Sequence, residues 1–356
     1  MTKFNSIAHR IIHGLKFMYS DFAPTDSKNV SVQSQKKLHL LMQQILEKLH
    51  ENPKLLRLPI EKDEAYHARE CNNMRPVLDR AYKSVFKTIY EFYNFLYNAA
   101  LHGTIEGSQL SISSKFLKTN KIIYKPQYNI LLNEFGIYAE KVETEIIIQA
   151  DAEILQSFKL LAEQVPLNPN PWTPYALINF ACCLFADNFD YLLSRVDAAN
   201  NLNGLLFELQ QKCLQNGYEQ HIRTSFGATG FDFNIMLQNK IGGFIIVYNI
   251  RKCQPFSFGT MNGVSEKAML ADFANLDSDL QQHFIGICKT CNSCLICTKG
   301  GKNKIFATSV KHDDKEYNLC PSFPQHSWST IDHDLTEVLF KYHEAQEKYG
   351  VDWRKR

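Results

Sequence analysis

The chain has 356 residues, of which 45% are hydrophobic and 21% are charged, and its formal net charge at pH 7 is only +2. This is the composition of an ordinary globular protein, and a nearly neutral chain gives no overall argument for nucleic-acid binding. The length suggests roughly two domains, and it allows a sizeable core to form without disulfides or metals.

The N-terminal residues lack the features of a secretory signal. Residues 1–20 place apolar side chains at helical spacing and interrupt them with basic ones, without a small-residue cleavage site. This spacing predicts an amphipathic helix. No uncharged apolar stretch of about 18 residues occurs, so we expect no membrane span. Ten cysteines without a signal peptide predict a cytoplasmic protein whose thiols are reduced or bind metal.

Residues 1–165 are predicted to form a helical domain. An apolar stripe over 38–49 predicts one helix, which Asn52 and the proline after it should end. A second, longer helical pattern runs over 63–101, and Pro76 should kink this helix or mark its true start.

The segment 108–150 has a mixed pattern. We expect two short helices over 108–117 and 127–135, with Gly136 ending the second, and then a β-hairpin over 137–149. Two short helices followed by a hairpin form a winged-helix-like order, which is an analogy at the level of the fold.

A proline-rich segment over 166–174 divides the chain. It follows a helix that Asp151 should cap and that should end near Gln164. Its four prolines cannot continue a helix, so we predict a linker between two domains here.

The residues 175–287 are predicted to form an α+β domain. Grouped strand signals between flanking helical patterns favour a small antiparallel sheet. The expected strands are 231–237, 244–250 and 256–261, and the expected helices are 175–185, 187–198, 203–214, 264–273 and 279–287. The predicted fold class is therefore α+β and mainly helical, with a helical N-terminal half.

Five cysteines are concentrated near the C-terminus. Cys288, Cys291, Cys294 and Cys297 are each three residues apart, and Cys320 follows after a lysine- and glycine-rich stretch. This order resembles the tails of uncharacterised bacterial proteins, and the resemblance implies no activity.

The stretch between the cysteines predicts a hairpin. Residues 304–310 alternate as a strand, 312–314 supply a turn and 316–319 return. An antiparallel hairpin would bring the last cysteine back beside the cysteine run. We therefore predict a Cys-rich metal-binding hairpin over 288–330, followed by a C-terminal helix over 331–356.

Four thiolates are enough for a tetrahedral zinc site. We favour Cys291, Cys294, Cys297 and Cys320 as the ligands, because Cys288 lies furthest from the hairpin base in the sequence and at the end of a predicted helix. The C-x₂-C-x₂-C run with a distant Cys-Pro also resembles the ligands of a bacterial [4Fe–4S] ferredoxin. It lacks the second cluster run of that family. A hairpin rich in lysine and glycine would also expose the site to water, whereas an iron–sulfur centre is usually more sheltered, so zinc is preferred and [4Fe–4S] is the alternative.

Two lysine-rich segments could contact nucleic acid. One surrounds the cysteines, where the lysines also offset the negative charge of four thiolates on zinc. The other holds Lys115, Lys118, Lys121 and Lys125 with the aromatic residues Phe116, Tyr124 and Tyr128, a combination that single-strand binding uses. A solvated helix face explains the same residues, so nucleic acid is not the favoured partner.

No catalytic or nucleotide-binding motif occurs in the sequence, and we assign no catalytic residue. The sequence thus predicts a non-enzymatic, zinc-stabilised protein that acts as a binding or regulatory module. The helical half would supply contacts to a protein partner. An iron–sulfur redox protein and a nucleic-acid-binding protein are the alternatives.

Overall fold

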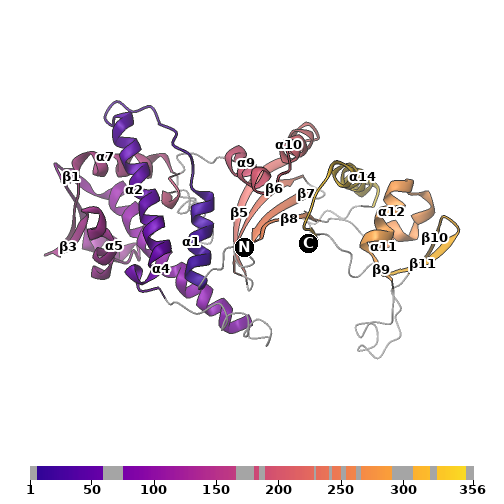
Figure 1. The fold of residues 1–356 in the computed structure, drawn as a ribbon, viewed down its shortest axis with the longest axis horizontal. Coiled ribbons are helices and arrows are strands. Elements are labelled where there is room, and N and C mark those ends of the chain that lie inside the picture. The colour runs from indigo at the N-terminus through magenta and orange to yellow at the C-terminus, as the bar shows by residue number, and fades with distance from the viewer. Residues whose placement is uncertain are drawn as a thin grey trace. The chain divides into compact units, whose positions relative to one another are not determined.

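A computed structural model describes residues 6–58, 75–165, 180–183, 189–227, 230–239, 243–249, 254–261, 266–290, 308–320 and 327–349. The chain forms two compact units (Figure 1). The first comprises residues 1–195, 223–233 and 249–254, and the second comprises 196–222, 234–248 and 255–356. Helices and antiparallel sheets occur together, which confirms the predicted α+β class.

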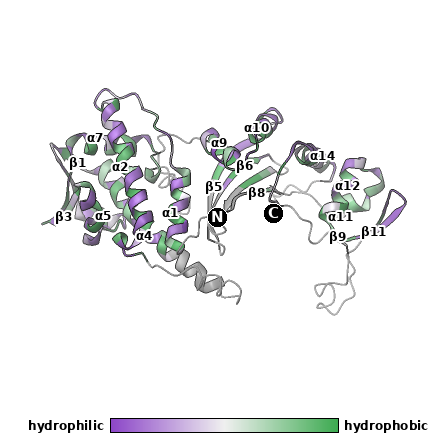
Figure 2. Ribbon diagram, viewed as in Figure 1, coloured by the Kyte–Doolittle hydropathy of each residue, from purple (hydrophilic) through white to green (hydrophobic). Residues whose placement is uncertain are grey.

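Four long helices form the framework of the first unit: α1 (Ile7–Met18), α2 (Val32–Glu51), α4 (Arg75–His102) and α7 (Ala152–Gln164). They pack on one another through apolar stripes, which Figure 2 shows as green residues beside purple ones. As predicted, α2 ends before Pro53 and the Asp151 carboxylate caps α7, accepting from the Glu153 N–H at 2.8 Å. Among the described residues, no helix is both long and apolar enough to cross a membrane.

A four-stranded antiparallel sheet completes the first unit. Its order is β1-β2-β4-β3, with β1 (Thr104–Glu106), β2 (Gln109–Ser113), β3 (Tyr138–Val142) and β4 (Glu145–Gln149). The hairpin predicted over 137–149 is confirmed as β3 and β4. The helix predicted over 108–117 is wrong in its first half, because the buried Leu110 and Ile112 alternate with less buried neighbours and this period of two forms β2.

Short helical elements lie between β2 and β3. They are α5 (Ser114–Thr119), η2 (Pro126–Tyr128), α6 (Asn129–Leu132) and η3 (Asn133–Phe135). Gly136 ends the last of them with a φ of 69°, as predicted, in a left-handed conformation that favours glycine. The order from α4 to β4 is therefore one helix, two strands (β1 and β2), four short helical elements and two strands (β3 and β4), and β2 pairs with β4.

The predicted linker at 166–174 lies outside the described residues, so the domain boundary there stays a prediction. The residues 180–183 that follow it pack into the first unit. The Phe180 ring lies 5.4 Å from the Tyr97 ring, and the Cys182 thiol donates to the Leu15 carbonyl at 3.3 Å. The first unit therefore continues beyond this segment, as far as Arg195.

A five-stranded sheet has the order β12-β8-β7-β6-β5. Its strands are β5 (Glu219–Gly227), β6 (Gly230–Gln238), β7 (Gly243–Asn249), β8 (Gln254–Met261) and β12 (Ser327–Trp328). The strands β6, β7 and β8 match the three that the sequence predicts. The strands β5 and β12 were not predicted from the sequence.

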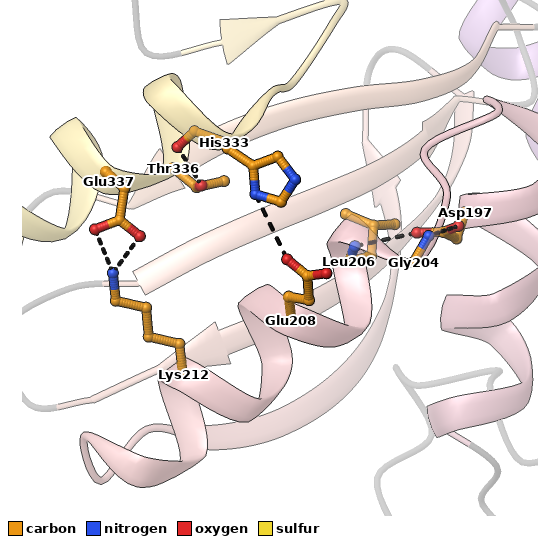
Figure 3. Close-up of polar contacts among 8 residues, drawn as sticks. All are labelled: Asp197, Gly204, Leu206, Glu208, Lys212, His333, Thr336 and Glu337. Carbon is orange, nitrogen blue, oxygen red and sulfur yellow. Dashed lines mark hydrogen bonds and ion pairs between the residues drawn. The ribbon is translucent and has the colours of Figure 1, made fainter.

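Helices α9 (Phe189–Ala199), α10 (Leu205–Gln215) and α14 (His333–Tyr349) also match predicted helices. Figure 3 shows how polar groups position α10 and α14. The buried Asp197 carboxylate accepts from the N–H of Gly204 at 2.8 Å and of Leu206 at 3.1 Å. Lys212 of α10 lies 2.5 Å from the Glu337 carboxylate of α14.

Candidate metal centre

The candidate centre begins where α12 (Ser278–Ile287) ends. The Asp277 carboxylate caps the start of this helix, and Cys288 is its C-terminal cap, with its N–H donating to the Phe284 carbonyl at 2.9 Å. The predicted position of Cys288 at the end of a helix is therefore confirmed. Two earlier helical elements of the same region are α11 (Glu266–Ala271) and η4 (Phe273–Asn275).

The predicted hairpin is present as β10 (Thr308–His312) and β11 (Lys315–Cys320). Asp313 and Asp314 connect the two strands, with φ values of 48° and 58°. Two central residues with positive φ form the type I′ turn, whose twist fits a tight hairpin and which Asp tolerates better than most residues. The turn thus sets the register that ends at Cys320.

A third, two-residue strand links this hairpin to the cysteine run. The strand β9 (Lys289–Thr290) pairs antiparallel with the end of β11: Thr290 lies opposite Leu319, and Lys289 lies opposite Cys320. The return of Cys320 to the start of the cysteine run is therefore confirmed. Metal binding stays a prediction.

The two faces of the hairpin have different surroundings. Val310, Tyr317 and Leu319 share one face and pack on an apolar cluster with Phe284 of α12 and Tyr342 of α14. The other face carries polar residues that are exposed: Ser309, Lys311, Glu316 and Asn318. By the alternation of strand side chains, Cys320 belongs to this second face.

Cys288 and Cys320 are both 6% exposed, but their environments differ. Cys288 belongs to the apolar cluster together with Leu319. Cys320 lies on the polar face and is buried although the residues beside it on that face are exposed. The two cysteines are therefore close together where β9 pairs with β11, but their thiols lie on opposite faces of this sheet.

Polar contacts hold the hairpin and α14 against α11 and α12. The His312 Nδ1 lies 2.9 Å from the Gln281 Oε1 of α12. Lys348 of α14 lies 2.8 Å from the Asp272 carboxylate, which also accepts from the Tyr349 hydroxyl. The hydrogen bonds from Lys348 and Tyr349 hold the pKa of Asp272 well below its usual range.

The predicted ligands Cys291, Cys294 and Cys297 lie outside the described residues. Within the described part of the chain, no three His, Cys, Asp or Glu side chains form a group that could hold a metal ion. What the structure does place is the chain on both sides of the predicted site, through β9 before it and β11 after it.

A buried polar contact between Tyr218 and α14 was not predicted from the sequence. The Tyr218 hydroxyl lies 2.9 Å from the His343 Nδ1, and the His343 ring lies 4.5 Å from the Phe244 ring. Burial lowers the pKa of His343 to about 3, so this imidazole is neutral. The only signal in the sequence is the helical spacing of His343 with Leu339 and Phe340, which are also buried.

Comparison with protein-family models, with curated proteins and with solved structures gave no match for this chain. The function is therefore argued from the chain's own residues.

Proposed function

We propose that Cys291, Cys294, Cys297 and Cys320 bind one structural Zn²⁺ ion, and that the protein is a binding or regulatory module stabilised by this ion. The observation that supports the proposal is the pairing of β9 with β11, which puts Cys320 opposite Lys289. This pairing brings a cysteine that is remote in the sequence to the start of the C-x₂-C-x₂-C run.

The geometry of the described strands allows the ligands to meet. Cys291 directly follows Thr290, which lies opposite Leu319. Adjacent Cα atoms are about 3.8 Å apart and paired Cα atoms about 5 Å apart, so the Cα atoms of Cys291 and Cys320 are separated by at most about 13 Å.

The surroundings of Cys288 argue against it as a ligand. Its position in the sequence suggested that it lies far from the hairpin base, but this reason is wrong, since Cys288 adjoins the residue that pairs with Cys320. The better reason is its environment. It packs in the apolar cluster with Phe284 and Leu319, where a thiolate would lose its solvation.

A zinc ion with four thiolate ligands would be structural rather than catalytic. Four sulfurs fill the tetrahedron and leave no open position for an activated water. The polar, exposed face of the hairpin supports zinc over an iron–sulfur cluster, which is usually more sheltered. Four thiolates and one Zn²⁺ carry a charge of about −2, and Lys311 would offset part of it.

Metal analysis of the purified protein tests the proposal. We expect about one zinc per chain, loss of that zinc in Cys320→Ser, and full retention in the matched control Cys288→Ser. A metal-free protein from metal-replete growth would overturn the proposal. So would iron and sulfide with visible absorption, or zinc that survives Cys320→Ser but is lost in Cys288→Ser.

A further inference from the structure

The first unit carries a group of exposed lysines that no other feature of the fold explains. Lys118 and Lys121, at the end of α5 and just after it, and Lys141 of β3 line an open hollow of about 450 Å³. Lys115 lies one helical turn before Lys118. These four residues are named the lysine surface. All four are exposed.

The charges of the lysine surface are not neutralised by the described residues. None of its four ammonium groups lies within ion-pair distance of a described carboxylate, whereas the nearby Lys125 pairs with Glu91 at 2.6 Å. On β3 and β4, Lys141 shares a face with Ile146, and the acidic Glu140 and Glu145 belong to the opposite face of the sheet. The acidic residues nearest to Lys141 along the chain are Glu140 and, at the hairpin turn, Glu143.

The aromatic rings of this region pack on neighbouring side chains, and Phe116 and Tyr124 are only partly exposed. The Tyr124 hydroxyl donates to the Ala139 carbonyl at 2.6 Å, and the Tyr124 ring packs 5.1 Å from the Phe95 ring. The Phe116 ring lies 4.7 Å from the His102 ring, and Tyr128 is fully buried. The structure therefore does not support the single-strand binding that the sequence pattern suggested, and it leaves the phosphate backbone as the target of the lysines.

The helical segment after α5 offers few groups that could read bases. The side-chain amide of Asn129 exchanges hydrogen bonds with the Ala139 backbone at 2.6 and 2.8 Å. Glu134 pairs with Lys48 at 3.2 Å, and Ile130 is exposed but apolar. Sequence is read by hydrogen bonds to base edges, and in this segment the side-chain amides of Gln127 and Asn133 are the ones that remain for it.

Packed helices and strands present the lysine surface. The lysine surface is presented by α5, the segment after it and β3, all held on α4 and the four-stranded sheet. The winged-helix-like order that the sequence predicts over 108–150 stays an analogy, because β2 replaces the first half of the first predicted helix. A fold alone does not fix a function, so the charges carry the argument.

We propose that the lysine surface binds the phosphate backbone of double-stranded DNA without reading its sequence. Several lysines without ion-pair partners at one surface are the feature that releases counterions from a duplex. This proposal depends only on the first unit, so it stands or fails independently of the metal.

Fluorescence anisotropy with two unrelated duplexes of about 20 base pairs tests this proposal at about 50 mM salt. We expect equal affinity for both duplexes and a log–log salt slope of about −3 to −4, which is the value for four phosphate contacts. Lys118→Glu/Lys121→Glu should weaken binding at least about tenfold and reduce the slope by about 2. The control Lys28→Glu/Lys36→Glu makes the same charge change at two other exposed lysines and should bind within about twofold of the original chain.

Three results would overturn the proposal. One is the absence of duplex binding at low salt, and another is an equal loss in the two double variants, which would reflect net charge alone. The third is tighter binding of single-stranded DNA, of duplex RNA or of anionic lipid vesicles than of duplex DNA. Equal thermal unfolding of the double variants shows that both are folded.

Discussion

Two small sheets of this protein are built by different means. The sheet of the first unit pairs β2 with β4 and β4 with β3, each over five residue pairs, and buries Leu110, Ile112 and Ile148. The sheet beside the cysteine run pairs β9 with β11 over only two residue pairs. Apolar burial holds the first sheet and one face of the second, and the proposed zinc ion would add a further link at the short β9 pairing.

The largest expected effect comes from removing that link. Cys320→Ser should loosen residues 286–349 and leave the first unit folded, because the metal would organise one region only. Local stability there should fall by about 3 kcal/mol or more, which corresponds to hydrogen exchange at least about 100-fold faster. Unchanged protection would show that Cys320 is not a ligand, and faster exchange everywhere would show that the two regions depend on each other.

A substitution that creates a cavity in the first sheet gives the converse test. Ile148→Ala removes a side chain that is 4% exposed and should destabilise the first unit by about 2–4 kcal/mol. Urea unfolding with and without a zinc chelator measures this, and the chelator should not alter the difference from the original chain. If the chelator changed the loss of stability caused by Ile148→Ala, the first sheet would also depend on the metal, and the two sheets would not differ in this respect.

The pH dependence of stability sharpens the comparison within the second unit. The pKa of His343 is lowered to about 3 in the folded chain, against about 6.5 when unfolded, so its neutral form is favoured by folding. The free energy of unfolding that neutral His343 contributes is fully present above about pH 6.5. It falls as the pH falls, and about 1–2 kcal/mol of it is lost at pH 5. Urea midpoints at pH 7.5 and 5 should therefore differ less in His343→Phe, and an equal difference would show that His343 does not titrate on unfolding.

The smallest effect concerns the start of α10. Asp197→Ala removes the acceptor of the Gly204 and Leu206 N–H groups (Figure 3) and should cost about 1 kcal/mol. Asp197→Asn keeps an acceptor and should cost less. Thermal unfolding compares the two, and a cost that appears only after zinc removal would mean that α10 relies on the metal region.

Local patterns predicted the elements whose side chains repeat clearly. The stripe of α2, the cap at Asp151 and the hairpin of β3 and β4 all follow from neighbouring residues. The strand β2 was predicted as part of a helix, because its five alternating residues run directly into α5. The strand β9 could not be predicted, since two residues become a strand only through a partner about 30 positions away.

For the candidate site, the hairpin and the return of Cys320 could be predicted from alternation and turn residues. The environment of Cys288 could not, because it depends on the packing of α12 and α14 around the hairpin. The pairing of Tyr218 with His343 was missed for the same reason, since these residues are remote in the sequence.

The hydrogen bonds that close the first unit have a consequence for its synthesis. Helix α1 leaves the ribosome early, yet the Leu15 carbonyl accepts from Cys182, and the Phe17 carbonyl accepts from Arg195 at 3.0 and 3.2 Å. At about 5–20 residues per second, these donors emerge roughly ten seconds or more after α1. During that interval α1 would lack its final partners, and a nascent chain released at Val165 would never acquire them.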